Sequence, residues 1–180
     1  MPTMTLTVDG QPGVTGTGWT SNSGFYTKAQ AVETDNGDTA YIEAGTNGEV
    51  TSFTFANPSV SSGDIASITS VQLITAGRFP ARGSGGEDVD YSYLIGVGSG
   101  HSETLNYPNR AGHVAVNGTA RTTNVAGSAW TYSNLQDVII QITKNTASSP
   151  DTRVGYIALL VTYVAPATTT DNAIFFGTNF

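Results

Sequence analysis

The stretch "TDNGDTAYIEAGTNGEVTSFTFANPS", residues 34–59, decides the fold class because it alternates turns with short strands. Each of its two turns contains an Asn-Gly pair, at 36–37 and 47–48, and this pair strongly favours a tight hairpin. The segments "TAYIEA" and "EVTSFTFA", which follow the turns, are rich in aromatic and β-branched residues. The stretch therefore predicts two antiparallel strands and a β-rich chain.

The segments on both sides of this stretch extend the same pattern. "TMTLTV", residues 3–8, alternates apolar residues with Thr, while "ITSVQLIT", 68–75, is apolar on both faces and predicts a covered central strand. "RVGYIALLVTYVAP", 153–166, is the longest predicted strand. "FYTKAQAV", 25–32, is interpreted as a strand because its flanks are rich in turn residues. The sequence predicts an all-β fold: a single antiparallel β-sandwich, jelly-roll-like, with about 8–10 strands.

The length of 180 residues suits one domain with two short terminal regions. We expect an N-terminal strand or arm with a loop at 1–18, the sandwich at 19–165, and a C-terminal tail or arm at 166–180. Either the terminal segments complete the domain's own sheets, or they are arms that contact a neighbour. The second alternative makes the apolar residues of both ends interface candidates: Met4, Leu6, Val8, Ile174, Phe175, Phe176 and Phe180.

The composition argues against several classes of partner. The net charge is −7, and the seven basic residues form no cluster of the kind that grips phosphates, so we expect neither nucleic acid nor an anionic membrane as a partner. The absence of cysteine excludes disulfides and thiolate zinc sites. The first residues, "MPTMTLTVDG", lack the basic start and apolar core of a secretion signal, which predicts a protein that is made in a cytoplasm and is not exported by the signal-peptide route.

No catalytic motif is recognisable, so we expect a protein that is not an enzyme and needs no cofactor. A calcium ion is a weaker alternative, because "DNGD" and "GGEDVD" contain carboxylates that could bind a hard cation. The candidate ligands are Asp35, Asp38, Asp88 and Asp90. Neither segment has the spacing of an EF-hand loop, and an Asn-Gly turn accounts for the first without an ion.

Five aromatic residues could stack against a sugar: Tyr91, Tyr93, Tyr107, Trp130 and Tyr132. Tyr91 and Tyr93 are two positions apart and therefore lie on the same face of their strand. The alternative is that these rings face the core or a subunit interface, where tyrosine is also favoured.

The segment "GSAWTYSNLQDVIIQI", residues 127–142, is interpreted as a structural joint. Trp130 is expected to plug the entry to a strand rather than to bind a ligand. Ser133 or Asn134 would cap a single helical turn, and Leu135 would attach that turn to the core. The strand that follows is predicted to present Val138, Ile140 and Ile142 on one face.

Several of these phrases together resemble structural proteins of bacteriophage virions that have a jelly-roll-like sandwich. They are "TDNGDTAYIEAG", "FTFANPSVSSGDIASITSVQLITAGRF", "GSAWTYSNLQDVIIQI" and the closing "VGYIALLVTYV". The resemblance covers about residues 34–164. It lies in the order of strands and turns, not in a catalytic signature. Proteins of this kind decorate the head or build fibres and collars.

The resemblance implies a non-enzymatic capsid decoration protein, located in the virion, that stabilises a phage capsid. Its implied partners are the major capsid protein or a neighbouring structural protein and further copies of itself, with a trimer favoured. The missing basic arm argues against a coat protein that packages the genome directly. A carbohydrate-binding sandwich module of a fibre or adhesin is the alternative.

Overall fold

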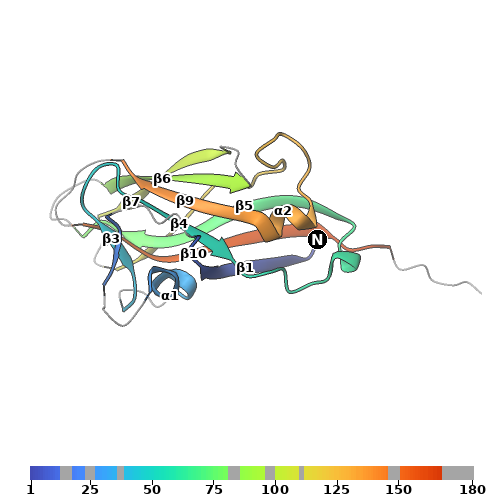
Figure 1. The fold of residues 1–180 in the computed structure, drawn as a ribbon, viewed down its shortest axis with the longest axis horizontal. Helices are drawn as coiled ribbons and strands as arrows, with labels where there is room; N and C mark the ends of the chain where they lie inside the picture. Colours follow the sequence, from blue (N-terminus) through green and yellow to red (C-terminus); the bar gives the residue numbers. More distant parts are fainter. Residues whose placement is uncertain are drawn as a thin grey trace, which may run out of the picture.

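The computed structural model describes residues 1–12, 18–22, 27–35, 39–80, 86–95, 100–109, 112–145 and 151–167. In these ranges the chain forms ten strands, two six-residue α-helices and one 3-10 turn (Figure 1). Neither α-helix of the described ranges is long and apolar enough to cross a membrane. The strands are β1 (Thr3–Gly10), β2 (Thr20–Ser21), β3 (Ile42–Ala44), β4 (Val50–Phe55), β5 (Ser67–Arg78), β6 (Gly86–Ile95), β7 (Ser102–Pro108), β8 (Val114–Asn117), β9 (Val138–Lys144) and β10 (Thr152–Val164). The helices are α1 (Lys28–Glu33), η1 (Ser62–Asp64) and α2 (Tyr132–Asp137).

The strands form two layers, which we call sheet A and sheet B. In sheet A the long strand β10 pairs with β5 along one side and with β3 and the first half of β1 along the other, while β2 and β8 extend the sheet at its edges. In sheet B the order is β1, β4, β9, β6, β7. Every pairing between these strands is antiparallel. The predicted antiparallel, jelly-roll-like β-sandwich is therefore confirmed.

Strand β1 belongs to both layers and joins them. Its residues 3–7 pair with β10 in sheet A, and Val8 and Gly10 pair with β4 in sheet B after a shift in register. Met4, Leu6 and Val8 are buried in the core. The expectation that these three side chains form a contact arm is therefore wrong: the N-terminal segment completes the domain's own sheets, which was the first alternative.

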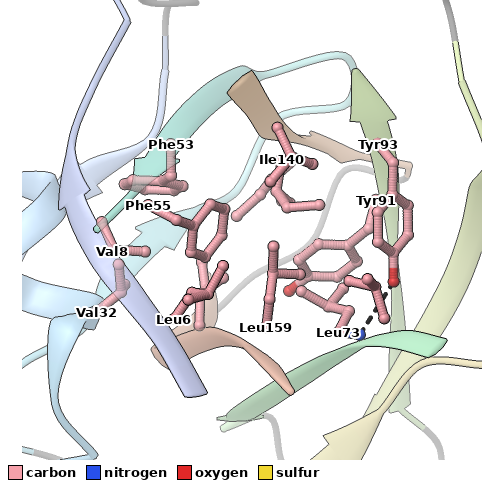
Figure 2. Packing of buried hydrophobic residues seen from close by; sticks show 14 of the residues in the cluster. Leu6, Val8, Val32, Phe53, Phe55, Leu73, Tyr91, Tyr93, Ile140 and Leu159 are labelled. Carbon is pink, nitrogen blue, oxygen red and sulfur yellow. Dashed lines mark hydrogen bonds between the residues drawn. The ribbon is translucent and has the colours of Figure 1, made fainter. Parts of the chain in front are cut away.

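The core fills the space between the two sheets. Figure 2 shows Phe53 and Ile140 of sheet B facing Leu6, Leu73 and Leu159 of sheet A. The strand β9 behaves as its alternation predicts, because its even-numbered apolar residues are buried while Ile139 is only half-buried. Burying side chains of this size stabilises the fold by about 1.5–3 kcal/mol each.

Helix α1 corrects the prediction of a strand at 25–32. Thr27 caps the helix: its hydroxyl accepts the Gln30 backbone N–H at 3.2 Å, and the Gln30 side chain accepts the Thr27 N–H at 3.0 Å. This reciprocal pair satisfies two backbone donors that a helix start would otherwise leave open. Ala31 and Val32 are buried in the core, and Figure 2 shows Val32 beside Val8 of β1.

Helix α2 confirms the predicted single turn but changes its cap. Thr131, rather than Ser133 or Asn134, is the N-cap residue. Its hydroxyl accepts the Asn134 backbone N–H, and the Asn134 side chain accepts the Thr131 backbone N–H at 3.1 Å. Leu135 is fully buried, as expected. Strand β9 follows the helix directly, so this turn sets where the strand enters sheet B.

The segment 118–130, which we call the closing segment, lies along the side where β5 and β7 face each other. Arg121 and Val71 of β5 exchange two backbone hydrogen bonds of 2.9 and 2.8 Å, and Gly118 donates to the Leu73 carbonyl at 2.9 Å. Arg121 also donates to the Ser102 carbonyl of β7 at 3.4 Å. The closing segment thus satisfies backbone groups on an edge that would otherwise be open.

Candidate functional site

The aromatic residues expected to bind sugar do not form an exposed row. Tyr91 and Tyr93 of β6 and Tyr107 of β7 are fully buried, Trp130 is 3% exposed, and Tyr132 is half-buried. Tyr91 and Tyr93 do share one face of β6, but that face points toward sheet A (Figure 2). The prediction of a shared face is correct, whereas the exposed stacking platform is wrong because the opposite sheet covers the rings.

The buried phenols form a chain of hydrogen bonds through the core. The hydroxyls of Tyr91 and Tyr107 are bonded to each other, and Tyr107 donates to the Thr75 hydroxyl of β5 at 2.8 Å. Thr75 in turn donates to the Val116 carbonyl of β8. The chain runs from sheet B to the far edge of sheet A, so these polar groups bond the layers together in a medium where an unpaired group is costly.

Tyr93 makes a second connection between the sheets. Its hydroxyl accepts the backbone N–H of Leu73 at 3.0 Å, drawn as the dashed line in Figure 2. The same hydroxyl donates to Glu103 Oε1 at 2.9 Å. Burial raises the pKa of Tyr93 far above its usual value, and the neighbouring Glu103 carboxylate raises it further, because both disfavour the phenolate.

Glu103 of β7 is a nearly buried carboxylate that holds the closing segment in place. Besides Tyr93, it accepts the Thr119 backbone N–H at 2.7 Å and lies 3.5 Å from the Arg121 guanidinium. Its three partners come from β6 and from two positions of the closing segment. Glu103 is therefore occupied by structural bonds.

The indole N–H of each tryptophan donates a hydrogen bond to a backbone carbonyl. Trp130 Nε1 donates to the Arg121 carbonyl and Trp19 Nε1 donates to the Glu49 carbonyl, each at 3.0 Å, and both rings are buried. Trp130 is buried, as the interpretation of a plug expects, but it precedes helix α2 rather than a strand. Tyr132, the next aromatic residue, donates to the Val60 carbonyl at 3.2 Å.

An ion pair between a buried lysine and a partly buried glutamate joins β9 to β6, and sequence interpretation missed it. Lys144 is fully buried, and its Nζ is 2.9 Å from Glu87 Oε2. The alternation of the two strands could have revealed the pair. Lys144 lies on the same face of β9 as Ile140 and Ile142, and Glu87 lies on the same face of β6 as Tyr91. A buried pair of this kind is strongly destabilising to break, because removing one partner leaves an uncompensated charge.

The described calcium candidates, Asp35, Asp88 and Asp90, form no cluster of three metal ligands. Asp88 and Asp90 point outward from β6 and accept hydrogen bonds from Asn106 and Thr104 of β7, the former at 2.8 Å. Asp35 is exposed, and Asp38 lies outside the described residues. Among the described residues, no three carboxylate or imidazole side chains gather as metal ligands would. Cross-strand partners on β7 thus account for the positions of Asp88 and Asp90.

Polar side chains line the outer face of sheet B. It contains cross-strand rows in which Ser52, Gln141, Ser92 and Ser102 are neighbours, and in which Thr143, Asp90 and Thr104 are neighbours. Most of these side chains are half-buried or exposed, although Ser52 is buried. We call this surface the polar face. No pocket opens between the described residues.

The interface candidates of the C-terminal region, Ile174, Phe175, Phe176 and Phe180, lie outside the described residues.

Comparisons with known proteins establish no family. Neither the family models nor the curated proteins that were compared match the chain. Among solved structures, one similar chain is CBM35, a carbohydrate-binding module from Cellvibrio japonicus Abf62. The two chains are 11% identical, with a TM-score of 0.43, over 92% of this chain and 97% of that one. The fold assignment rests on the strand pairing of this chain itself.

Proposed function

We propose that this protein is a structural component of a bacteriophage virion, most simply a capsid decoration protein, and that it acts through contacts with other virion proteins. The resemblance of its strand phrases to virion proteins supports the class. One structural observation carries the mode of action: the buried phenols, Glu103 and Lys144 are bonded between strands and sheets. These groups stiffen the sandwich, and the strand faces and chain ends are left for partners.

The polar face fits such a role. Hydrogen-bonding side chains of modest size cover it, and they suit a wet interface in which direct and water-mediated bonds are mixed. A stiff sandwich binds with little further loss of conformational entropy, because its backbone is already ordered.

The experiment is a co-sedimentation assay with phage particles that lack the protein. We expect the purified chain to pellet with the particles and to saturate a fixed number of sites. Ser102→Arg places a bulky charge on the polar face and should weaken binding about tenfold or more. Ser128→Arg, at an exposed position of the closing segment, is the matched control and should bind as the unaltered chain does. Failure of the unaltered chain to bind particles would refute the proposal.

Carbohydrate binding is the competing function. The rings that motivated it are buried or half-buried, so a glycan site would need other side chains. Binding to glycans on an array that persists when the protein is diluted, together with no binding to phage particles, would favour this alternative.

A further inference from the structure

One end of the sandwich, where β1 starts and β10 ends, exposes apolar side chains. Among the described residues, the large hydrophobic side chains that are exposed are Met1, Val114 and Val164. Met1 and Val164 lie together, because Tyr163 N donates to the Pro2 carbonyl at 3.1 Å. Ile65 is only partly buried and lies beside Val164, whose carbonyl accepts the Ala66 N–H at 2.8 Å. We call Met1, Ile65 and Val164 the apolar pole.

The core directly beneath this pole is covered less completely than elsewhere. Four buried hydrophobic residues keep 6% or more of their surface exposed, and three of them are Met4, Ile68 and Tyr163 at this end. Tyr163 is the register partner of Ile68. Tyr163 directly precedes Val164 in β10, and Ile68 lies three residues after Ile65. A further apolar cover at this end would complete the burial that the two sheets begin.

The chain itself carries an apolar segment that starts from the same end. Residues 165–172, "APATTTDN", are a polar link, and "AIFF" follows at 173–176. The described part of the link, up to Ala167, is exposed and leads away from the sandwich beyond the end of β10 (Figure 1). Eight extended residues span about 26 Å, which is enough to reach a neighbouring molecule.

We propose that the segment 173–176 of a second copy covers the apolar pole, so that copies of this protein assemble by exchanging their C-terminal tails. This inference rests on the proposed function, because it names the contact that would join copies in a structural assembly. The outward direction of the chain at Ala167 argues for delivery to another copy rather than a return to the same pole. Because each copy offers both a tail and a pole, the exchange can close into a symmetric oligomer.

The first test changes the pole and measures mass by light scattering over a hundredfold range of concentration. The unaltered chain should have a mass of at least twice 18.7 kDa. Val164→Asp should shift it to the monomer. Val114→Asp is a matched control, because Val114 is 37% exposed against 38% for Val164 but lies at the opposite end of the sandwich. Equal oligomers of the Val164→Asp variant and the unaltered chain would overturn the proposal.

The second test changes the tail. Phe175→Asp with Phe176→Asp should also yield a monomer, whereas Thr168→Asp with Thr170→Asp adds the same charge to the polar link and should keep the oligomer. Mixing the Val164→Asp variant with the double-Phe variant restores one intact tail and one intact pole. We expect a mixed dimer in that experiment, which a tail folded onto its own pole could not produce.

The outcomes separate this inference from the proposed function. A monomeric unaltered chain whose tail resists protease would mean that the tail covers its own pole, and tail exchange would be wrong. A monomer with a protease-sensitive tail that still pellets with phage particles would also refute tail exchange, yet the virion role would stand. An oligomer that assembles through the tail but binds no particle would refute the virion role alone.

Discussion

Three buried tyrosines and one tryptophan contribute strongly to the stability of this sandwich and to its dependence on pH. Burial raises the pKa of Tyr91, Tyr93 and Tyr107, because a phenolate cannot be solvated between the sheets. For Tyr91 the nearby charge of Tyr107 adds to the effect. Their folded-state pKa values lie above the value of about 10 in an unfolded chain.

The raised pKa values predict loss of stability in alkali. Below pH 10 both states keep these phenols protonated and the full stability is present; above pH 10 the unfolded chain releases protons that the folded chain retains. Each tyrosine should then lower the free energy of unfolding by about 1.4 kcal/mol per pH unit. Urea unfolding at pH 9 to 11 measures this slope. Tyr91→Phe removes one of the three phenols, so the free energy of unfolding should fall less steeply with pH, by about 1.4 kcal/mol per pH unit. An unchanged slope would contradict the raised pKa of Tyr91.

Trp130 should contribute to stability as a core residue does. Trp130→Ala should lower the free energy of unfolding by about 3–5 kcal/mol, because it removes a buried ring and leaves a cavity. Trp130→Phe loses the indole hydrogen bond to the Arg121 carbonyl, which still accepts the Val71 N–H, and it keeps most of the ring volume, so its cost should be smaller. Chemical denaturation followed by circular dichroism measures both variants. A loss near zero for the alanine variant would mean that the ring is exposed in solution.

The two short helices illustrate how elements of this fold depend on their ends. With six residues each, α1 and α2 are too short to be stable alone, and each has a complete capping box together with a buried apolar residue. Helix α1 could have been predicted from the sequence, because Thr27 and Gln30 have the Thr-x-x-Gln spacing of that motif. The turn-rich flanks concealed it, since they are equally typical of a short strand.

The caps predict matched losses of stability. Thr27→Ala and Thr131→Ala should each lower the free energy of unfolding by about 1 kcal/mol, because each removes the oxygen that accepts a helix N–H. Thr→Ser at the same positions keeps the acceptor and should cost less. Thermal unfolding of the four variants tests this, and equal losses for Ala and Ser would argue that the hydroxyls are not the cause.

Folding of the whole domain depends on its N-terminal strand, β1. It bonds to β10 in one sheet and β4 in the other, and it contributes three buried side chains. Strand β10, the last described strand, ends at Val164, and the exposed residues 165–167 follow it.

Truncation should therefore affect the two ends differently. Deleting residues 1–8 should abolish cooperative unfolding, because the burial of Met4, Leu6 and Val8 is lost, at about 1.5–3 kcal/mol each, together with the pairing of both sheets. Deleting 168–180 should leave the fold intact. Dispersion of amide signals in a two-dimensional NMR spectrum reports on both, and a well-folded chain without residues 1–8 would restore the interpretation of that segment as an arm.

Local periodicity determined the fold class, the presence of strands β3 and β4 and the alternation of β9, because these depend only on neighbours in the sequence. The tight hairpin predicted from the Asn-Gly pair at 47–48 is wrong, because β3 pairs with β2 and β10 in sheet A whereas β4 pairs with β1 and β9 in sheet B. The pair at 36–37 lies outside the described residues. The same alternation put Tyr91 and Tyr93 on one face, and Lys144 on the face of Ile140. Only the tertiary structure decided which face is buried, that β1 joins the two sheets, and that Asp88 and Asp90 bond to β7 rather than to an ion. The physical reason is that a strand's periodicity separates its two faces, whereas the choice of the inner face depends on strands far away in the sequence that come to cover it.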